Sequence, residues 1–340
     1  MRDIADQLGI SVSTVSLALN HKDQGRVNPP LAEKIRTTAN GMGYRPNPHA
    51  LGLKLSKSHA IALICNTGPD DPFLSGLTGG AQAAAAEAGY ILITIPVTDA
   101  SHAEESAIET ALQRDVDGIV FAADYYRRRN IPTVPDTTPF VFLDCISTGS
   151  NPVVTEVIAD EVQGSYEATS HLISAGHTRI GYIGIDDDRY LARRLRAKGF
   201  CDAVREHLGH ETDPLIVNAS DPSISAGEAA AEWLFTRPAA ERPTALFCFS
   251  DRTAFGAAQA ARGHGLSLPE DLSIVGFDNV EYTSEFFTPR LTTVELPHQR
   301  MSSEAVRQLV HLIDNPHSAP RRIKVPCPLI HRDSVNSHHS

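Results

Sequence analysis

Residues 3–20 read DIADQLGISVSTVSLALN, a stretch that predicts two short helices joined by a tight turn. Ile4, Ala5 and Leu8 form the apolar side of the first helix. Gly9 supplies the left-handed residue that ends this helix, and Ser11 can cap the next one. Such a steeply docked helix pair is typical of a helix-turn-helix that contacts DNA.

The second helix of this pair has two different faces. The apolar face is expected to hold Val12, Val15 and Leu19, which dock the helix. The other face offers short hydroxyl side chains to base edges and phosphates, from Ser13, Thr14 and Ser16. A third helix is expected over residues 31–42, after Pro29 and Pro30.

Charge is distributed unevenly along the 340 residues. The whole chain has a net charge of −11, which taken alone argues against nucleic-acid binding. Residues 1–60, however, contain eight Lys and Arg against four Asp and Glu, a net charge of +4, whereas the remainder has −15. A basic N-terminal module on an acidic body indicates an end that binds a polyanion.

From residue 60 onward, short β-rich runs alternate with helical stretches. Strands are expected at 60–65, 90–95, 118–122, 139–143, 179–184, 244–249 and 272–277, and helices at 73–88, 102–114, 161–175, 190–208, 225–236, 252–264 and 298–314. Several of these strands are apolar on both faces, as in parallel sheets covered by helices. The fold class is therefore α/β: a three-helix DNA-binding domain followed by two doubly wound lobes with a ligand cleft between them.

Five dispersed cysteines, with no C-x-x-C pair, fit a reducing cytoplasm rather than a disulfide framework. The chain starts in polar residues and has no apolar run near the ~18 residues of a membrane span, so no membrane association is expected. No catalytic motif for hydrolysis, nucleotide binding or zinc chemistry is found, and no cofactor, metal site or catalytic residue is expected.

Residues 44–53, YRPNPHALGL, complete the N-terminal pattern. Together with the D-I-A-x-x-L-G-I-S-x-S-T-V-S-x-x-L-N run, they make residues 1–335 resemble the lactose-repressor (LacI/GalR) family of bacterial regulators. The resemblance implies a recognition helix in the major groove and a hinge helix that folds in the minor groove, with Leu53 as an apolar wedge. The implied DNA-binding residues are Ser11, Ser13, Thr14, Ser16, Leu17, Asn20, Asn47, Ala50 and Leu53.

Leu17 stands where this family often has Arg, so a thymine methyl is the expected contact instead of a guanine.

Polar residues follow several predicted strands, at the sheet edge where ligands bind in α/β folds. They are Asp144, Ser250, Asp251 and Asp278. The runs GHTRIGYIG (176–184) and RAKGF (196–200) are similar to family motifs, which implies that Arg196 projects into the cleft and that Phe73 lies against the ligand. Carboxylates with a guanidinium suit a hydroxyl-rich effector such as a sugar. Alternatively, these Asp residues are helix caps, and Arg196 pairs with an acidic neighbour on the surface.

The expected domains are a helix-turn-helix at 1–46, a hinge at 47–57, a two-lobed effector-binding and dimerisation domain at 58–335 and a frayed tail at 336–340. Lobe one is expected to take residues 58–158 and 290–320, and lobe two residues 159–289 and 321–335.

The sequence therefore predicts a cytoplasmic, homodimeric repressor that binds operator DNA and a small-molecule effector. Two alternatives are weaker. A sugar-binding transport protein would share the two-lobed body, but the absent signal peptide and residues 3–20 disfavour it. A sugar-processing enzyme would need a catalytic motif.

Overall fold

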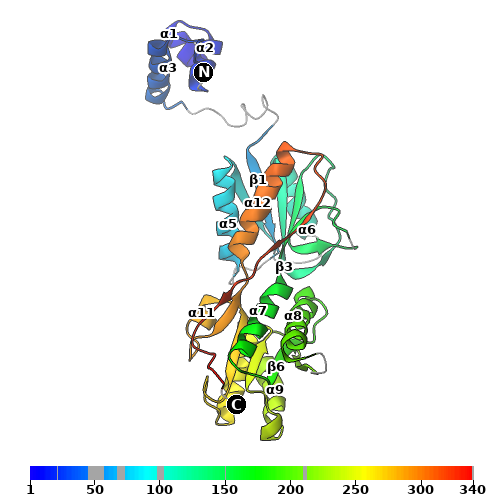
Figure 1. Ribbon diagram of the computed structural model, residues 1–340. Coiled ribbons are helices and arrows are strands. Elements are labelled where there is room, and N and C mark those ends of the chain that lie inside the picture. Colours follow the sequence, from blue (N-terminus) through cyan, green and yellow to red (C-terminus); the bar gives the residue numbers. More distant parts are fainter. Residues whose placement is uncertain are drawn as a thin grey trace. The chain divides into compact units, whose positions relative to one another are not determined.

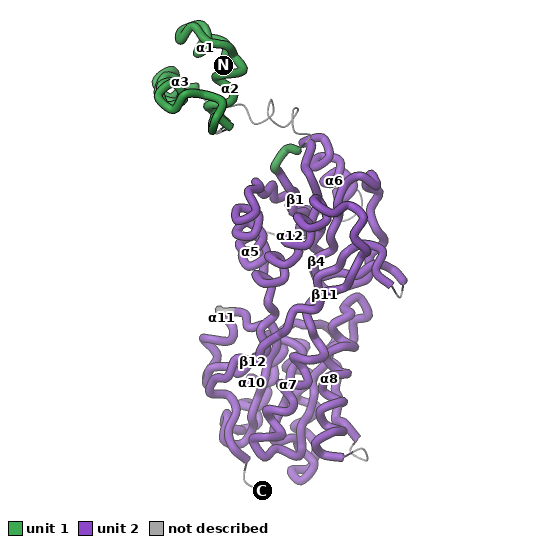
Figure 2. Tube along the Cα trace, turned by 45° about the horizontal axis from the view of Figure 1, so that its top comes forward, with its two compact units in different colours: residues 1–59 green, residues 60–340 purple. Residues whose placement is uncertain are grey.

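The computed structural model describes residues 1–20, 22–44, 57–66, 73–97, 103–149, 151–209 and 213–338. Two compact units divide the chain, Met1–His59 and Ala60–Ser340 (Figure 2). Within the described residues, no helix is long and apolar enough to cross a membrane.

The first unit contains three helices: α1 (Arg2–Leu8), α2 (Val12–Leu19) and α3 (Pro29–Gly41). The predicted helix pair is confirmed, and α3 begins two residues earlier than expected because proline is tolerated in a first helical turn. The helices share one small core, formed by Ile4, Ala5, Val15, Ala18, Ala32, Ile35 and Ala39. Arg36 of α3 pairs with Asp23 of the preceding loop at 2.8 Å, which ties the loop to the domain.

The second unit is built on two six-stranded sheets, which confirms the two doubly wound lobes. The first sheet has the order β11-β5-β4-β3-β1-β2 and the second β12-β10-β9-β8-β6-β7, with parallel pairing except between β10 and β12. The strands are β1 (Ala60–Cys65), β2 (Ile91–Pro96), β3 (Gly118–Arg129), β4 (Phe140–Ser147), β5 (Thr155–Ala159), β6 (Ile180–Ile185), β7 (Leu215–Ala219), β8 (Ala245–Cys248), β9 (Ser273–Asp278), β10 (Thr292–Glu295), β11 (Arg322–Val325) and β12 (Leu329–Ile330).

All seven predicted strands and all seven predicted helices of this unit are present. The strands that the sequence did not indicate are β5, β7, β10, β11 and β12, which have two to five residues each. Strands this short carry too few residues for a recognisable apolar pattern, and pairing with longer neighbours decides their conformation.

Helices cover both faces of each sheet. On the first sheet, α5 (Leu74–Glu87) and α12 (His298–Asp314) lie side by side on one face and α6 (Ala103–Gln113) packs against β1 (Figure 1). On the second sheet, two packed pairs are formed, α7 (Glu161–Ser174) with α8 (Leu191–Leu208), and α9 (Ile224–Phe235) with α10 (Asp251–Gly263). Two short helices complete the unit, η1 (Ala239–Glu241) and α11 (Glu281–Ser284).

The predicted lobe segments near the C-terminus are wrong in detail. Strand β10 pairs with β9 in the second sheet, and β11 pairs with β5 in the first, so these two strands lie in the lobe opposite to the predicted one. The rest of these segments agrees with the prediction, since residues 298–314 form a helix on the first sheet and β12 belongs to the second. The chain therefore passes between the lobes three times, after β5, after β10 and after β11. Three connections between two lobes form a natural hinge.

The predicted frayed tail is also wrong for its described part. The backbone N–H of Asn336 donates to Ser273 Oγ at 3.0 Å, and that of His338 donates to the carbonyl of Ala175 at 2.7 Å. His177 contacts the same segment through the carbonyl of Asn336 at 3.2 Å. Residues 336–338 are thus bound to the second lobe because their backbone groups find partners there.

Candidate functional sites

The turn between α1 and α2 is built as the sequence predicts. Gly9 ends α1 with φ +65°, a conformation that glycine adopts without the steric cost of a Cβ. Ser11 caps α2 by accepting a hydrogen bond from the backbone N–H of Thr14 at 3.1 Å. These two devices set the angle between the helices and leave one side of α2 at the surface.

The surface side of α2 differs from the predicted one. Val15 and Ala18 are buried, whereas Val12 is 44% exposed, so its assignment to the apolar docking face is wrong. Val12 is the first residue of the helix, and the buried stripe begins only one turn later. With 3.6 residues per turn, the side chains of one arc are those of Val12, Ser13, Ser16, Leu17 and Asn20. We call these five residues the recognition arc.

Thr14, predicted to face DNA, belongs to the helix cap. Its hydroxyl lies 2.8 Å from Ser11 Oγ, and it falls outside the recognition arc. Asn20 donates to the carbonyl of Ser16 at 2.8 Å, which leaves its amide oxygen without a partner in the described part of the chain. The predicted hinge contacts Asn47, Ala50 and Leu53 lie outside the described residues.

A cavity of about 390 Å³ opens between the two lobes of the second unit. Five of the six predicted effector residues line it: Phe73, Asp144, Arg196, Ser250 and Asp278. Sequence reasoning missed most of the remaining wall, to which both lobes contribute Asp124, Tyr125, Tyr126, Glu161, Tyr190, Phe249, Arg252 and His298. The structure therefore brings together side chains that are up to 225 residues apart, from Phe73 to His298.

Arg196 of α8 is buried and lines this cavity, where it bonds several other residues. Its Nε donates to Glu161 Oε2 at 2.6 Å, its Nη2 to Glu161 Oε1 at 3.2 Å and its Nη1 to Asp278 Oδ1 at 3.2 Å. The carbonyl of Phe249 also accepts from Nη1. The guanidinium carbon lies 3.6 Å from the ring centroid of Phe277, so aromatic packing holds the fork in one orientation.

Asp144 comes from an irregular part of the first sheet. Pairing between β3 and β4 shifts register between Ala122 and Arg127, and Asp144 itself has φ +53°. Its side chain is buried, and Oδ1 has no hydrogen-bond partner among the described residues. Burial, with the charge of Glu161 as the next cause, raises the pKa of Asp144 to about 7.

Asp278 ends β9 and starts a turn. Asp278 has φ +105° and Asn279 φ +53°, so the strand stops abruptly at the cavity. Burial raises the pKa of the Asp278 carboxyl to about 7, and the Arg196 charge opposes this rise. Two carboxyl groups that titrate near neutrality thus face one guanidinium.

Asp251, predicted to bind the effector, does not line the cavity. It is fully buried at the start of α10, where its carboxylate accepts from the backbone N–H of Val280 at 2.8 Å and from the hydroxyl of Thr293. Asp251 therefore holds the turn after Asp278 in place. Its neighbour Ser250 caps α10 through a reciprocal pair of hydrogen bonds with Thr253.

Aromatic side chains form the rest of the wall. Tyr125 from the first lobe stacks on Tyr190 from the second, with ring centroids 4.4 Å apart. Phe73 stacks on His298 at the same separation, and burial lowers the pKa of His298 to about 4, so this ring is neutral at pH 7.

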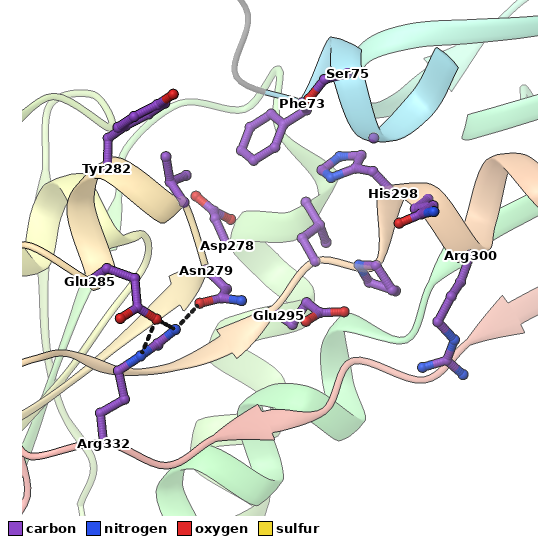
Figure 3. Close-up of a pocket in the computed structure, with 15 residues that line it drawn as sticks. Phe73, Ser75, Asp278, Asn279, Tyr282, Glu285, Glu295, His298, Arg300 and Arg332 are labelled. Carbon is purple, nitrogen blue, oxygen red and sulfur yellow. Dashed lines mark hydrogen bonds and ion pairs between the residues drawn. The ribbon is translucent and has the colours of Figure 1, made fainter. Parts of the chain in front are cut away.

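A second pocket, of about 640 Å³, adjoins the cavity (Figure 3). It shares Phe73, Asp278 and His298 with the cavity, and on its far side Arg332 donates to Glu285 at 2.6 Å and to Asn279 Oδ1 at 2.8 Å. Within the described residues, no group of three or more His, Cys, Asp or Glu side chains is arranged to hold a metal ion.

Some of the missed residues had a signal in the sequence. Glu161 lies two residues after the end of the short strand β5, and Tyr125 and Tyr126 come three and four residues after the apolar run at 118–122. Since such positions mark the carboxyl edge of a parallel sheet, recognising β5 would have added Glu161 to the candidates. Tyr190 and His298 stand before or at a helix start and have no comparable signal.

Comparison with known proteins matches both units. Residues 1–47 match bacterial regulatory proteins of the lacI family, and residues 169–335 match the periplasmic binding protein-like domain. The chain is 33% identical over 339 residues to the HTH-type transcriptional regulator DegA of Bacillus subtilis, covering 98% of this chain and 97% of that protein. It is 30% identical over 346 residues to the HTH-type transcriptional repressor CytR of Escherichia coli, covering 99% and 96%.

The fold agrees over the same extent. The lac repressor dimer, solved with operator and the anti-inducer ONPF, superposes with a TM-score of 0.75 at 20% identity, over 98% of each chain. The helix-turn-helix unit, the two-lobed unit with its interlobe cavity and the full-length relatives lead to one conclusion: this chain belongs to the LacI family of bacterial transcriptional regulators.

Proposed function

We propose that this regulator is an operator-binding repressor, active as a homodimer in the cytoplasm, whose DNA affinity changes when a small hydroxyl-rich effector binds between its lobes. One observation carries the proposal: a single chain combines a recognition arc on the surface side of α2 with a polar cavity to which both lobes contribute. The relative CytR is named a repressor, which favours repression over activation.

The recognition arc has the chemistry needed to read DNA. Ser13 and Ser16 offer hydroxyls, which donate to or accept from base edges and phosphates. Val12 and Leu17 offer apolar surface, which suits the methyl group of thymine. The net charge of +4 over residues 1–60 supplies the salt-dependent attraction to phosphates. Asn47, Ala50 and Leu53 are proposed to add minor-groove contacts, with Leu53 as the wedge that bends the operator.

The cavity suits a ligand with several hydrogen-bond donors. Asp144 and Asp278 offer carboxylate oxygens, and Phe73 offers a ring for an apolar ligand face. Because the wall comes from both lobes, a bound ligand changes the preferred angle between them. We infer a coupling to operator affinity of about 1–3 kcal/mol, the usual range for allosteric sites.

A homodimer follows from the need to place two recognition arcs about one helical turn apart on a pseudo-palindrome. The first lobe offers a suitable interface. Strand β2 is the last strand of the first sheet, and Ile91 on it is 67% exposed. An apolar side chain on an open sheet edge is typical of a surface that pairs with another copy.

The test is selection of bound sequences from a random DNA pool at stated salt, followed by a screen of sugars and related polyols for release. We expect an enriched pseudo-palindrome. The double variant Ser13→Ala/Ser16→Ala should bind the selected site about tenfold or more weakly, whereas Thr37→Ala, exposed on α3 and outside the arc, should bind normally. Absence of enrichment, with polyols still binding, would favour a sugar-binding protein without DNA function.

A further inference from the structure

The cavity described above also restricts the charge of its ligand, an inference that rests on the proposed function. We propose that the effector carries a positively charged amino group, and that Asp144 is the buried counter-ion that binds it. Phosphorylated and other anionic ligands are excluded from this position.

The first observation is an excess of carboxylates. Asp124, Asp144, Glu161 and Asp278 line the cavity, against the guanidinium groups of Arg196 and Arg252. Asp124 is paired with Arg127 at 2.8 Å, and Glu161 and Asp278 are both paired with Arg196. Arg252 is exposed, so solvent screens its charge. Asp144 therefore stands as the buried carboxylate that the protein has not neutralised with a partner of its own.

The second observation is the orphaned oxygen of Asp144. Asp144 is only 6% exposed and lines the cavity, and its Oδ1 has no hydrogen-bond partner among the described residues. A buried charged oxygen without a partner is costly and is uncommon in native proteins. A ligand group that donates a hydrogen bond to Oδ1 and carries a positive charge removes both parts of this cost.

The third observation is the state of Arg196. Of its five N–H donors, Glu161 uses two, and Asp278 and the Phe249 carbonyl use two more. Bidentate binding of a phosphate needs two free N–H donors on one guanidinium, and Arg196 has only one that is not used by the protein. The buried cation of the cavity is therefore committed to the protein's own carboxylates.

The fourth observation is the aromatic wall. Phe73, Tyr125, Tyr126, Tyr190 and Phe249 line the same cavity as Asp144. Aromatic rings attract cations through their quadrupole, and cages of such rings recognise ammonium groups in other proteins. A carboxylate among aromatic rings is a better environment for an amine than for a neutral hydroxyl.

The pKa of Asp144 agrees with this assignment. Burial and the charge of Glu161 raise it to about 7, and the opposing charge of Arg196 does not restore the ordinary value. The further groups that act on Asp144 are Asp124 and Asp278, which are also acidic. Amine binding should weaken as the pH falls below about 7, because Asp144 then takes up a proton.

The experiment uses the full-length protein and two probes of equal size, ethanolamine and ethylene glycol, titrated at pH 8 and constant ionic strength. We expect ethanolamine to raise the melting temperature of the wild type by about 2 °C more than ethylene glycol does. Inorganic phosphate at the same ionic strength should have no specific effect. In Asp144→Asn the two probes should give equal shifts, whereas Asp136→Asn, in an exposed loop, should behave as the wild type.

Equal shifts for both probes in the wild type overturn the proposal, as does an ethanolamine effect that persists in Asp144→Asn. A stabilisation by phosphate that depends on Arg196 also overturns it. These results leave operator selection unaffected, so the proposed function can stand while this inference fails. Conversely, amine binding that depends on Asp144, without enrichment of any DNA sequence, would support an amine as the effector and contradict the proposed operator binding.

Discussion

At the scale of single residues, the cavity depends on one buried guanidinium. Arg196 is enclosed by Glu161, Asp278 and two aromatic rings, so its neighbours are arranged for a planar fork. Two carboxylates buried beside it are tolerable only while that fork is present. This answers the alternative that the sequence left open: Arg196 does pair with acidic neighbours, but inside the cavity and not on the surface.

We expect Arg196→Lys to lower the free energy of unfolding by about 2–4 kcal/mol, because a lysine cannot bond both carboxylates and the Phe249 carbonyl together. Denaturant unfolding measures the change. Arg193→Lys is the matched control on the same helix, where Arg193 forms more exposed pairs with Asp186 and Asp188, and it should change stability by less than about 0.5 kcal/mol. Equal losses in the two variants would contradict the buried network.

We expect the Asp144→Asn substitution to stabilise the folded protein by an amount that depends on pH. The pKa of Asp144 is about 7 in the folded protein against 3.8 ordinarily, so the folded state binds more protons between these values and loses stability as the pH rises through them. Asparagine does not titrate, so the variant does not lose stability in this way as the pH rises. We expect it to be more stable than the wild type by about 1–4 kcal/mol at pH 8.

Near pH 4 this advantage should disappear, because Asp144 is protonated in the folded wild type. Unfolding by denaturant at several pH values follows the change. If the variant were more stable than the wild type by the same amount at pH 4 and pH 8, the difference would come from the backbone conformation at φ +53° and not from the charge of Asp144.

At the scale of elements, close helix packing depends on missing side chains. Gly79 and Gly80 are neighbours on α5, yet a Cβ on Gly80 would overlap the backbone of α12 at Gln299, whereas a Cβ on Gly79 would meet nothing within 4 Å. The hydroxyl of Ser303 on α12 donates to the carbonyl of Gly80 at 2.9 Å. Helix α12 begins with His298, which lines the cavity. The contact between α5 and α12 at Gly80 therefore helps to position His298 in the site.

Gly80→Ala should therefore destabilise the protein by about 1–3 kcal/mol, since the backbone of α12 must shift to admit the methyl group. Gly79→Ala should be neutral or stabilising by up to about 1 kcal/mol, because alanine favours a helix over glycine. Thermal unfolding of the two neighbouring variants gives the comparison. A destabilising Gly79→Ala would show that helix propensity and packing are not separable here.

At the scale of the whole molecule, each sheet of the second unit has, among the described residues, an edge strand with a neighbour on one side only. Strand β2 ends the first sheet and carries Ile91, and β7 ends the second and carries Ile216, which is 38% exposed. Charges are the usual protection of such edges, and both strands lack Lys, Arg, Asp and Glu. The proposed dimer uses the first lobe, so the two edges should respond differently to a charge.

We expect Ile91→Asp to shift the protein from dimer to monomer and to weaken operator binding at least tenfold, because one recognition arc cannot hold both half-sites. Ile216→Asp places the same charge on the other open edge and should leave the dimer intact. Sedimentation velocity measures the oligomeric state and a DNA titration the affinity. If Ile216→Asp alone dissociates the protein, the interface lies on the second lobe.

Features that depend on near neighbours in the chain could be predicted from the sequence. The α1–α2 turn needs Gly9 and Ser11 in close succession, and the α/β alternation depends on apolar periods within single segments, so both were predictable. Asp144, Arg196 and Asp278 were found because strand ends and family motifs mark them. The roles of these residues were not predictable in full, since Arg196 proved to be bonded by the protein itself.

Contacts between distant segments determine which side chains meet and which stay exposed. Glu161 and Tyr190 reach the cavity only because two sheets align their edges, and Asp251 misses it because Thr293 and Val280 occupy its carboxylate. Strands β10 and β11 exchange lobes relative to the expected order because short strands take the partner that is left open. Burial and neighbouring charge, which shift the pKa of Asp144, arise between segments distant in the chain and have no local signature.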